Sequence, residues 1–568
     1  MHQSHALRRL VLLAAITLSA CAASNPISPS LAQSPSPRVR IGGPVAAQLV
    51  ARHALSAGDI DVATEAYQSL LARDTDNMEL RQQAFLTALV AGRPEAVRLA
   101  RLLPNNQGAL LLLAGNDARE GNWRGAEARL NTLPRQGLMD LLRPMLVAWL
   151  QAGAGQTEAA LAILRPLTEA PRLRAIYAIN AATIADLGGN NAEAGRYYRM
   201  ANAENGGGNL QVARLYASWL ARQGESGEAE RVMLGISVND DVAMVMPAIM
   251  RNIAERQITK ATDGMAEVYT ALAALLRTQD SGEFPVVMLR LALHLRPDHT
   301  TARLLLAEIA AAGKHPETAL PVIASVAADD PLSAVVRMRR VAILHKLRRS
   351  DEALGVLDQL ARELPDRPEP LAARGDILRN LHRYGEAVAA YDKAVALVPS
   401  PTRAEWVLFY DRGIALDRDK QWAKAEADLL RALDLAPDQP FVLNYLGYSW
   451  AEQGTNLPRA RAMIERAANL RPDDGAITDS LGWVMFKLGD VPAAVRLMER
   501  AVELEPQDAT ITAHLGDVYW AAGRQLEAVF QWRRALALNP DAEETRKLEA
   551  RIREGEIVLG GNKAAALP

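Results

Sequence analysis

The side chain in this sequence with the clearest reactive chemistry is the thiol of Cys21, the single cysteine among 568 residues. A lone thiol cannot close an intramolecular disulfide, and it cannot supply the paired thiolates of a structural zinc site. An apolar run over residues 10–18 and the small residues Ser19 and Ala20 lie directly before it. Two arginines precede that run, so residues 1–20 have the layout of a secretory signal, which is too short to span a bilayer.

The segment Leu18-Ser19-Ala20-Cys21 resembles the lipobox of bacterial lipoproteins. That resemblance implies diacylglyceryl transfer to the Cys21 thiol, cleavage before it, and acylation of the new amino group. Several acyl chains anchor a protein durably, whereas a single chain binds a membrane only marginally. Because Ala22 follows instead of aspartate, the family rule implies the outer membrane of a Gram-negative cell, with the body facing the periplasm. The alternative is an ordinary cleaved signal with an incidental cysteine.

Beyond Cys21 the sequence offers little catalytic chemistry. It contains no Gly-x-Ser-x-Gly elbow, phosphate-binding loop, His-Glu-x-x-His motif or dinucleotide-binding glycine motif. His294 and His299 are five residues apart, which misses the three- or four-residue spacing of neighbours on one helix face. The formal net charge of −2 provides no global field for binding nucleic acid. We therefore expect no enzyme activity, no metal, no nucleic-acid partner, and no cofactor other than the lipid on Cys21.

The elements that position any site in this chain are helices. Alanine and leucine dominate, aromatic residues make up only 5%, and no long stretch alternates as a half-buried strand does. Single cores stop growing near about 250–300 residues, so a chain of this length needs several domains or a repeat array.

The second half of the chain repeats itself every 34 to 38 residues. Each unit closes with a proline, carries alanines twelve and five residues before it, and carries a glycine 24 or 25 residues before it. Small residues let two helices approach closely, and proline ends the second helix. This is the tetratricopeptide (TPR) pattern of stacked helix–turn–helix units. The prolines are Pro399, Pro437, Pro472, Pro506 and Pro540, and the glycines are Gly375, Gly413, Gly447, Gly482 and Gly516.

The first half carries a weaker form of the same pattern, with turn glycines at Gly58, Gly92, Gly121, Gly155, Gly189 and Gly224. Between Ala229 and Ala319 the pattern degrades, which leaves either divergent repeats or a hinge. The predicted fold class is all-α, an α-solenoid of TPR-type repeats in which each unit contacts mainly its neighbours. The predicted segments are a signal (1–20), a lipidated disordered tether (21–44), divergent repeats (45–235), degenerate repeats or a hinge (236–300), TPR repeats (301–544), and a capping helix with a loose tail (545–568).

A solenoid offers a concave face, so binding is the function that this architecture favours. Of the 27 aromatic residues, 16 lie from Tyr384 onward, and aromatics are enriched at interface hot spots. Tyr391 and Trp532 occupy a position that TPR units bury, so we expect them in the core. The candidates for contacting a partner lie on the groove side of the first helices, where a purely structural role is the alternative. They are Asn444, Tyr448, Asp479, Trp483, Phe486, Asp517 and Trp520.

A basic helix lies near the middle of the chain, with Arg337, Arg339, Arg340, His345, Lys346, Arg348 and Arg349. We expect a solvated face whose cations are favourable near a helix C-terminus. Contact with an acidic partner, or with a peptide carboxylate, is the alternative.

The segments Leu443-Asn444-Tyr445-Leu446-Gly447-Tyr448, Asp479-Ser480-Leu481-Gly482-Trp483 and Ala513-His514-Leu515-Gly516-Asp517 are more particular than the generic repeat. They resemble bacterial TPR outer-membrane lipoproteins of the LbcA/NlpI type, which are adaptors of carboxy-terminal processing proteases. The resemblance implies an adaptor that gathers such a protease and its cell-wall hydrolase substrates, and it carries over no catalytic residue. Three possibilities stay open beside it: an assembly or secretion factor for surface polymers, pili or outer-membrane proteins; a peptidoglycan- or glycan-binding lipoprotein; and a homo-oligomer.

Overall fold

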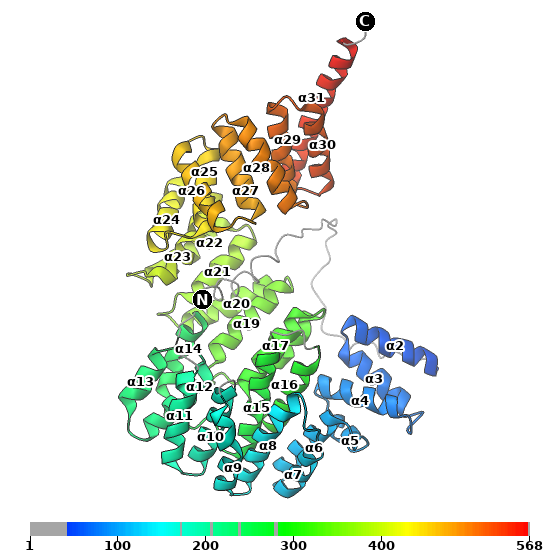
Figure 1. The fold of residues 1–568 in the computed structure, drawn as a ribbon. Helices are drawn as coiled ribbons and strands as arrows, with labels where there is room; N and C mark the ends of the chain where they lie inside the picture. The colour runs from blue at the N-terminus through cyan, green and yellow to red at the C-terminus, as the bar shows by residue number, and fades with distance from the viewer. Residues whose placement is uncertain (1–42, 171–172, 205–207, 237–239, 278–281, 566–568) are drawn as a thin grey trace.

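The computed structural model describes residues 43–170, 173–204, 208–236, 240–277 and 282–565 (Figure 1). Cys21, the signal and nearly all of the predicted tether lie outside this range. Within it the chain forms only helices and the turns between them, with no strand. The predicted all-α solenoid is confirmed.

The C-terminal half is a stack of antiparallel helix pairs that rises from the lower body of the molecule (Figure 1). Each pair is one repeat, and its two helices are joined by a tight turn. The pairs are α19 (Ser333–Lys346) with α20 (Ser350–Glu363), α21 (Glu369–Asn380) with α22 (Tyr384–Ala396), α23 (Trp406–Arg418) with α24 (Trp422–Leu435), α25 (Pro440–Glu452) with α26 (Leu457–Leu470), α27 (Gly475–Lys487) with α28 (Val491–Leu504), and α29 (Ala509–Ala521) with α30 (Gln525–Ala537).

The repeating small residues allow the close packing within these pairs. A Cβ at Gly375 would lie 2.5 Å from the ring of Tyr391, and one at Gly516 would lie 2.4 Å from the ring of Trp532. Both rings are buried, as predicted from their position in the repeat. The alanines twelve residues before each closing proline (Ala387, Ala425, Ala460, Ala494 and Ala528) are all fully buried. The sequence pattern therefore reports helix contacts directly.

The N-terminal half contains the weaker repeats as six helix pairs. All six predicted turn glycines adopt left-handed backbone, with φ between 72° and 87°. That region favours glycine because a Cβ is strained there. The pairs are α2 (Pro44–Ala57) with α3 (Ile60–Leu71), α4 (Met78–Ala91) with α5 (Glu95–Ala100), α6 (Gln107–Arg119) with α7 (Trp123–Asn131), α8 (Leu138–Gly153) with α9 (Thr157–Leu164), α10 (Arg174–Leu187) with α11 (Asn191–Glu204), and α12 (Leu210–Arg222) with α13 (Ser226–Leu234).

The segment that follows departs from a simple linear array. It contains α14 (Asp240–Arg251), α15 (Ala261–Leu276), α16 (Phe284–Leu295), α17 (Thr300–Ala312) and α18 (Ala319–Ala324). The pair α15–α16 keeps the hairpin form of a repeat, but it also packs back onto the N-terminal array: α15 contacts α6, α8 and α10, and α16 contacts α4 and α6. This return was not part of the prediction that repeats contact mainly their neighbours.

Specific contacts fix the returning pair. A Cβ at Gly264 of α15 would lie 2.2 Å from the indole of Trp149 in α8. In α16, Arg290 Nε donates a 2.7 Å hydrogen bond to the carbonyl of Val90, 200 residues earlier. One apolar core accordingly runs through helices from α2 to α20.

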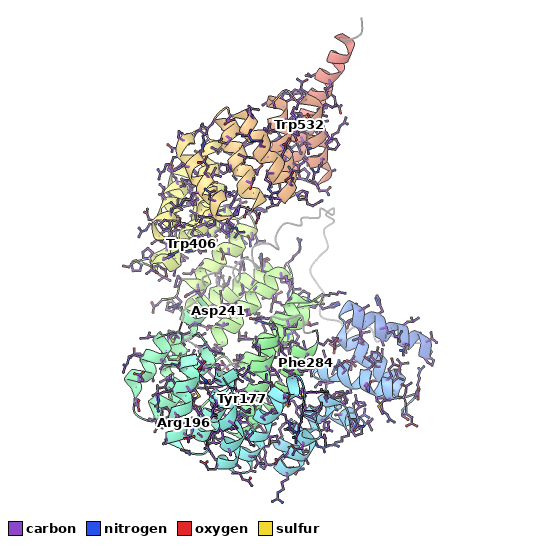
Figure 2. The ribbon with its side chains drawn as sticks, viewed as in Figure 1. Tyr177, Arg196, Asp241, Phe284, Trp406 and Trp532 are labelled. Carbon is purple, nitrogen blue, oxygen red and sulfur yellow. The ribbon has the colours of Figure 1, made fainter. Side chains whose placement is uncertain are left out.

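The C-terminal end also differs from expectation. The last helix, α31 (Ala542–Ala565), begins close to the predicted start but continues to Ala565, although we predicted a loose tail from Val558. It packs against α30, and Figure 2 shows Trp532 of α30 at this end of the molecule.

Candidate partner-binding surface

The first helices of successive repeats line the inner face of each array. In the C-terminal half α21 contacts α23, α25 contacts α27, and α27 contacts α29, whereas the second helices of successive repeats make no comparable contact. A stack of repeats curves toward the side on which the helices of successive repeats lie closer to one another. The concave side is therefore formed by α21, α23, α25, α27 and α29.

The two halves use this inner face differently. In the N-terminal half, α15 and α16 lie against the first helices α4, α6, α8 and α10, so the inner face is filled by the chain itself. From α20 onward, the substantial contacts join only helices that are next or next but one along the chain. Among the residues that the structure describes, the inner face of the C-terminal half has no such filling, apart from its end, where Arg551 of α31 pairs with Asp517.

Four of the predicted residues meet around His514 of α29. The His514 ring stacks on Trp483 of α27, with centroids 4.2 Å apart, and its Nδ1 lies 3.0 Å from the carboxylate of Asp479. Tyr448 of α25 lies 6.5 Å from the same ring, and Phe486 lies 5.4 Å from the Trp483 ring. Three consecutive first helices are therefore joined by one cluster of rings, which we call the His514 cluster.

Charges surround the edge of the His514 cluster. The Trp483 indole N–H donates to Glu452, and Lys487 Nζ lies 5.2 Å from the centroid of the Trp483 ring. Burial alone would lower the pKa of His514, but the Asp479 carboxylate, which accepts its hydrogen bond, raises the pKa above the usual value. The cluster therefore favours a protonated imidazole between two stacked helices.

A second group forms around Asp517, one turn farther along α29. Asp517 accepts a 2.9 Å hydrogen bond from the indole of Trp532 and lies 3.2 Å from the guanidinium of Arg551 in α31. Burial raises the pKa of the Asp517 carboxyl, and the Arg551 charge opposes that shift. The Trp520 ring lies 5.4 Å from the Trp532 ring. The last helix thus covers the end of the predicted surface.

The predicted contact residues differ in how much surface they present. Trp483 is 8% exposed and Asp479 is 5% exposed, so most of each side chain packs between repeats. Tyr448, Phe486 and Asn444 are half-buried. The Oδ1 atom of Asn444 is buried and has no hydrogen-bond partner among the described residues. A binding role for all seven residues stays a prediction, and the half-buried ones are the more accessible.

The central residue of the cluster was missed in the sequence. His514 stands two residues before Gly516 and three before Asp517, which places it on the same helix face as Asp517. That spacing was the signal in the sequence that could have identified His514 as a candidate site residue. Its contact with Asp479 depends on the stacking of neighbouring repeats, which the spacing within one helix does not report.

Five of the seven residues of the predicted basic helix lie on α19, but Arg348 and Arg349 do not, because α19 ends at Lys346 and these two arginines form the turn before α20. Arg337 lies 2.5 Å from Glu363 of α20, and Arg339 lies 3.2 Å from Glu308 of α17 and also pairs with Asp241. These charges join neighbouring helices, so they are less available to an acidic partner than their number suggests.

Two searches of the described residues gave no candidate. They contain no group of three or more histidine, cysteine, aspartate or glutamate side chains placed to hold a metal ion. Within the same part of the chain, no helix has the length and apolar character needed to cross a bilayer.

Sequence comparisons identify the repeats. Residues 251–407 match a model described as a tetratricopeptide repeat-like domain, and residues 480–543 match a tetratricopeptide repeat. The "TPR repeat-containing protein PA4667" of Pseudomonas aeruginosa is 33% identical over 159 residues, 28% of this chain and 26% of that protein. Human "Tetratricopeptide repeat protein 13" is 32% identical over 111 residues, 20% of this chain and 12% of that protein. The matched part of the chain thus spans about a quarter of the first relative and about an eighth of the second.

Solved structures of similar architecture align over most of the chain at low identity. The Cut9–Hcn1 hetero-tetramer aligns with 90% of this chain and 96% of its own, at 15% identity and a TM-score of 0.37. Yeast Tom70 aligns with 92% and 99%, at 12% identity and a TM-score of 0.31. Residues 251–407 and 480–543 therefore carry tetratricopeptide-type repeats, and the helix pairs of the described residues have the helix–turn–helix form of such repeats.

Proposed function

We propose that the chain is a non-catalytic, membrane-anchored scaffold that holds periplasmic proteins on the inner face of its C-terminal array. The observation that carries this proposal is the contrast between the two halves. In the described part of the chain, α15 and α16 fill the N-terminal inner face, whereas no returning helix pair lies against α21 to α27. Half-buried aromatic side chains such as Tyr448 and Phe486 lie along that face, and aromatics are frequent hot spots of interfaces.

The proposed partner is a carboxy-terminal processing protease, together with the cell-wall hydrolases that it cleaves. This part of the proposal rests on the resemblance of segments between residues 443 and 523 to the LbcA/NlpI-type adaptors. A scaffold of this kind needs no catalytic residue, because it acts by raising the local concentration of enzyme and substrate.

The proposed anchor is a lipid on Cys21, inserted in the outer membrane from the periplasmic side. Residues 22–43 would connect it to α2. A flexible linker of that length has a root-mean-square reach of about 25–30 Å. The array could therefore stand clear of the membrane surface and still recruit soluble partners.

The test is affinity purification of the acylated full-length chain from detergent-solubilised membranes, followed by identification of the bound proteins. The test variant is the double substitution Asn444→Ala and Phe486→Ala. Both side chains are half-buried, and neither takes part in the hydrogen bond between Asp479 and His514. The matched control is Phe530→Ala, an aromatic that is 65% exposed on a second helix, away from the inner face. Circular dichroism and thermal melting check that each variant is folded.

We expect the wild type and the Phe530→Ala control to recover a processing protease and the double variant to lose it. Recovery of secretion or polymer-export subunits instead would identify an assembly factor. Sedimentation with purified cell-wall sacculi in the absence of other proteins would indicate a glycan-binding role. Undiminished protease capture by a folded double variant would contradict the proposed surface.

A further inference from the structure

The N-terminal body contains an apolar cavity that the returning helices leave open. It has a volume of about 430 Å³ and lies between α10 and α12 on one side and α15, α17 and α19 on the other. Ligand cavities span roughly 300–1,000 Å³, so this volume suits a small ligand. Its lining is mainly aliphatic, with half-buried Ile176, Ile179, Leu304 and Leu305 among the side chains.

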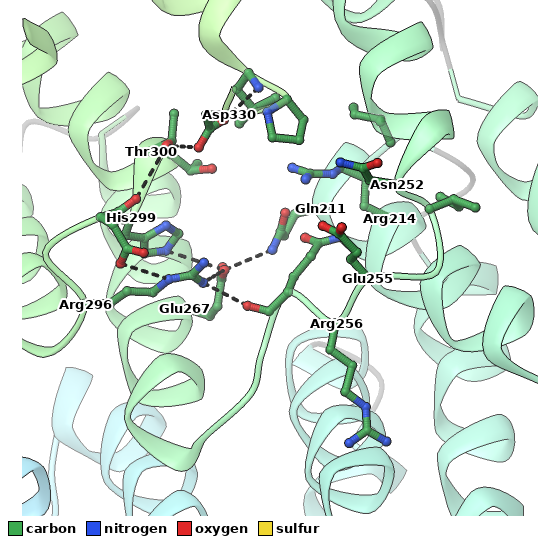
Figure 3. A pocket seen from close by; sticks show the side chains of 17 residues that line it. Gln211, Arg214, Asn252, Glu255, Arg256, Glu267, Arg296, His299, Thr300 and Asp330 are labelled. Carbon is green, nitrogen blue, oxygen red and sulfur yellow. Dashed lines mark hydrogen bonds and ion pairs between the residues drawn. The ribbon is translucent and has the colours of Figure 1, made fainter. Parts of the chain in front are cut away.

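A polar cavity of about 190 Å³ adjoins it (Figure 3). The two cavities share five lining residues: Gln211, Arg214, Glu267, Thr301 and Leu332. Figure 3 shows Arg296, His299 and Thr300 on one side of the polar cavity and Arg214 on the other. The combined space is therefore amphipathic, with a long aliphatic part and one polar end.

Four carboxylates line the polar end, those of Glu255, Glu267, Asp298 and Asp330, and two of them, Glu267 and Asp330, accept hydrogen bonds. Glu267 accepts a 2.9 Å hydrogen bond from Gln211, and Asp330 accepts one of 2.5 Å from the Thr300 hydroxyl. Asp330 also accepts a 2.7 Å bond from the backbone N–H of Leu332. These two acids are therefore committed to internal contacts.

Two nitrogen-bearing side chains at the same end are not satisfied. The Nε atom of Arg214 and the Nε2 atom of His299 are both buried without a hydrogen-bond partner among the described residues. His299 is only 4% exposed and lies 3.5 Å from Glu267, beyond good hydrogen-bond length. His299 is also the residue before α17, whose first backbone N–H groups and positive dipole end face the same cavity. Burial lowers the pKa of His299, so its ring is neutral and its Nε2 can accept or donate according to the tautomer. The Nε–H of Arg214 is always a donor, and leaving it buried and unpaired is costly, so this side chain lacks an acceptor.

We propose that this double cavity binds a single-chain anionic amphiphile of the long-chain carboxylate class. The hydrocarbon chain occupies the aliphatic part, and the carboxylate accepts hydrogen bonds from Arg214 and the α17 end of the polar part. An extended peptide fits the lining less well, because an aliphatic wall cannot pair the N–H and C=O groups of a buried peptide backbone. A neutral lipid would leave the guanidinium without its acceptor.

The test uses the chain without its signal and with Cys21→Ser, so that no lipid of its own competes. The probe is cis-parinarate, a fluorescent long-chain carboxylate, and the competitors are palmitate and hexadecanol. Ala271→Phe fills the aliphatic part from an exposed position of α15, and Arg214→Gln removes the charge at the polar end. The controls are Ala192→Phe, exposed on α11 and outside both cavities, and Arg231→Gln, whose side chain is 75% exposed.

We expect saturable binding of the probe and displacement by palmitate in the wild type and in both controls. Ala271→Phe should abolish binding, and Arg214→Gln should weaken palmitate about tenfold while leaving hexadecanol unchanged, since a charge-assisted hydrogen bond has about that effect. The proposal is overturned if the wild type does not bind the probe, if folded Ala271→Phe binds as well as the wild type, or if Arg214→Gln affects palmitate and hexadecanol equally. Preferential displacement by an apolar peptide would overturn it as well.

Discussion

Replacing Gly264 with alanine should loosen α15 from the N-terminal inner face. The added Cβ would lie 2.2 Å from Cε2 and Cζ2 of the Trp149 indole, far inside van der Waals contact. Trp149 is fully buried, and its Nε1 donates a 2.7 Å hydrogen bond to Asn180 Oδ1. The indole therefore cannot swing aside without breaking that bond, so the two helices must separate instead.

The magnitude follows from two opposing effects. Overpacking a tight contact costs about 1–3 kcal/mol. Replacing a helical glycine with alanine gains about 0.5–1 kcal/mol, because the backbone loses less entropy on folding. The matched control is Gly355→Ala in the middle of α20, where an added Cβ meets nothing within 4 Å. The control should show only the gain, so the two variants should differ by about 1–3 kcal/mol.

The assay must be local, because repeat arrays can open one region at a time. Hydrogen exchange followed by mass spectrometry should show faster exchange in peptides from α15 and from α8 in Gly264→Ala, with α25 to α30 unchanged. Urea unfolding provides the overall free energy. If α15 exchanges as slowly in Gly264→Ala as in the wild type and in Gly355→Ala, the close approach of α15 to α8 is not what holds the returning pair.

Three further outcomes are expected. Gly516→Ala should destabilise the C-terminal array in urea unfolding, because its Cβ would lie 2.4 Å from the Trp532 ring and the overpacking cost of about 1–3 kcal/mol outweighs the helix gain of about 0.5–1 kcal/mol; an unchanged midpoint would contradict this packing. The pKa of His514 is raised in the folded chain, so its stabilising effect is complete below the unfolded pKa of about 6.5 and is lost as pH rises through the folded pKa. The unfolding free energy of the wild type relative to His514→Asn should therefore fall as pH rises above about 6.5, and a difference that does not change with pH would refute the ion pair with Asp479. Cys21→Ser should move the chain from the envelope to the soluble fraction after high-salt washing, and retention in the envelope would argue against a lipid anchor.

The repeat columns were predictable because each reports a contact inside one unit. Gly375 and Tyr391 stand at a fixed separation within a helix pair, so the same separation recurs wherever the same contact is built. The periodicity of the sequence thus predicted the helix pairs, the turns and the buried rings of the C-terminal half. The end of α31 was not predictable in this way, since a last helix has no following repeat to impose the pattern.

The candidate surface was predictable only in part. Helix spacing correctly placed Tyr448, Trp483 and Asp517 on the first helices of their repeats, but exposure depends on how closely successive repeats stack. The stacking of α27 against α29 covers Trp483 with the His514 ring. The distance between the rings of Trp483 and His514 depends on two repeats, so the spacing of residues within one repeat does not determine it. The sequence therefore predicted which helix face lines the groove, but it did not predict which residues of that face are exposed.

The return of α15 and α16 was hidden for a different reason: contacts such as Arg290 with Val90 join residues 200 positions apart and occur once. A contact that occurs once leaves no period. The sequence does carry one indirect signal, because α15 buries residues on nearly every side, including Met265, Val268 and Tyr269. A helix that is apolar all round needs covering on all sides, which two neighbours in a linear array cannot provide. The degraded repeat pattern and this excess of apolar surface therefore have one physical cause. Residues freed from contacts with neighbouring repeats contact the chain's own N-terminal inner face instead.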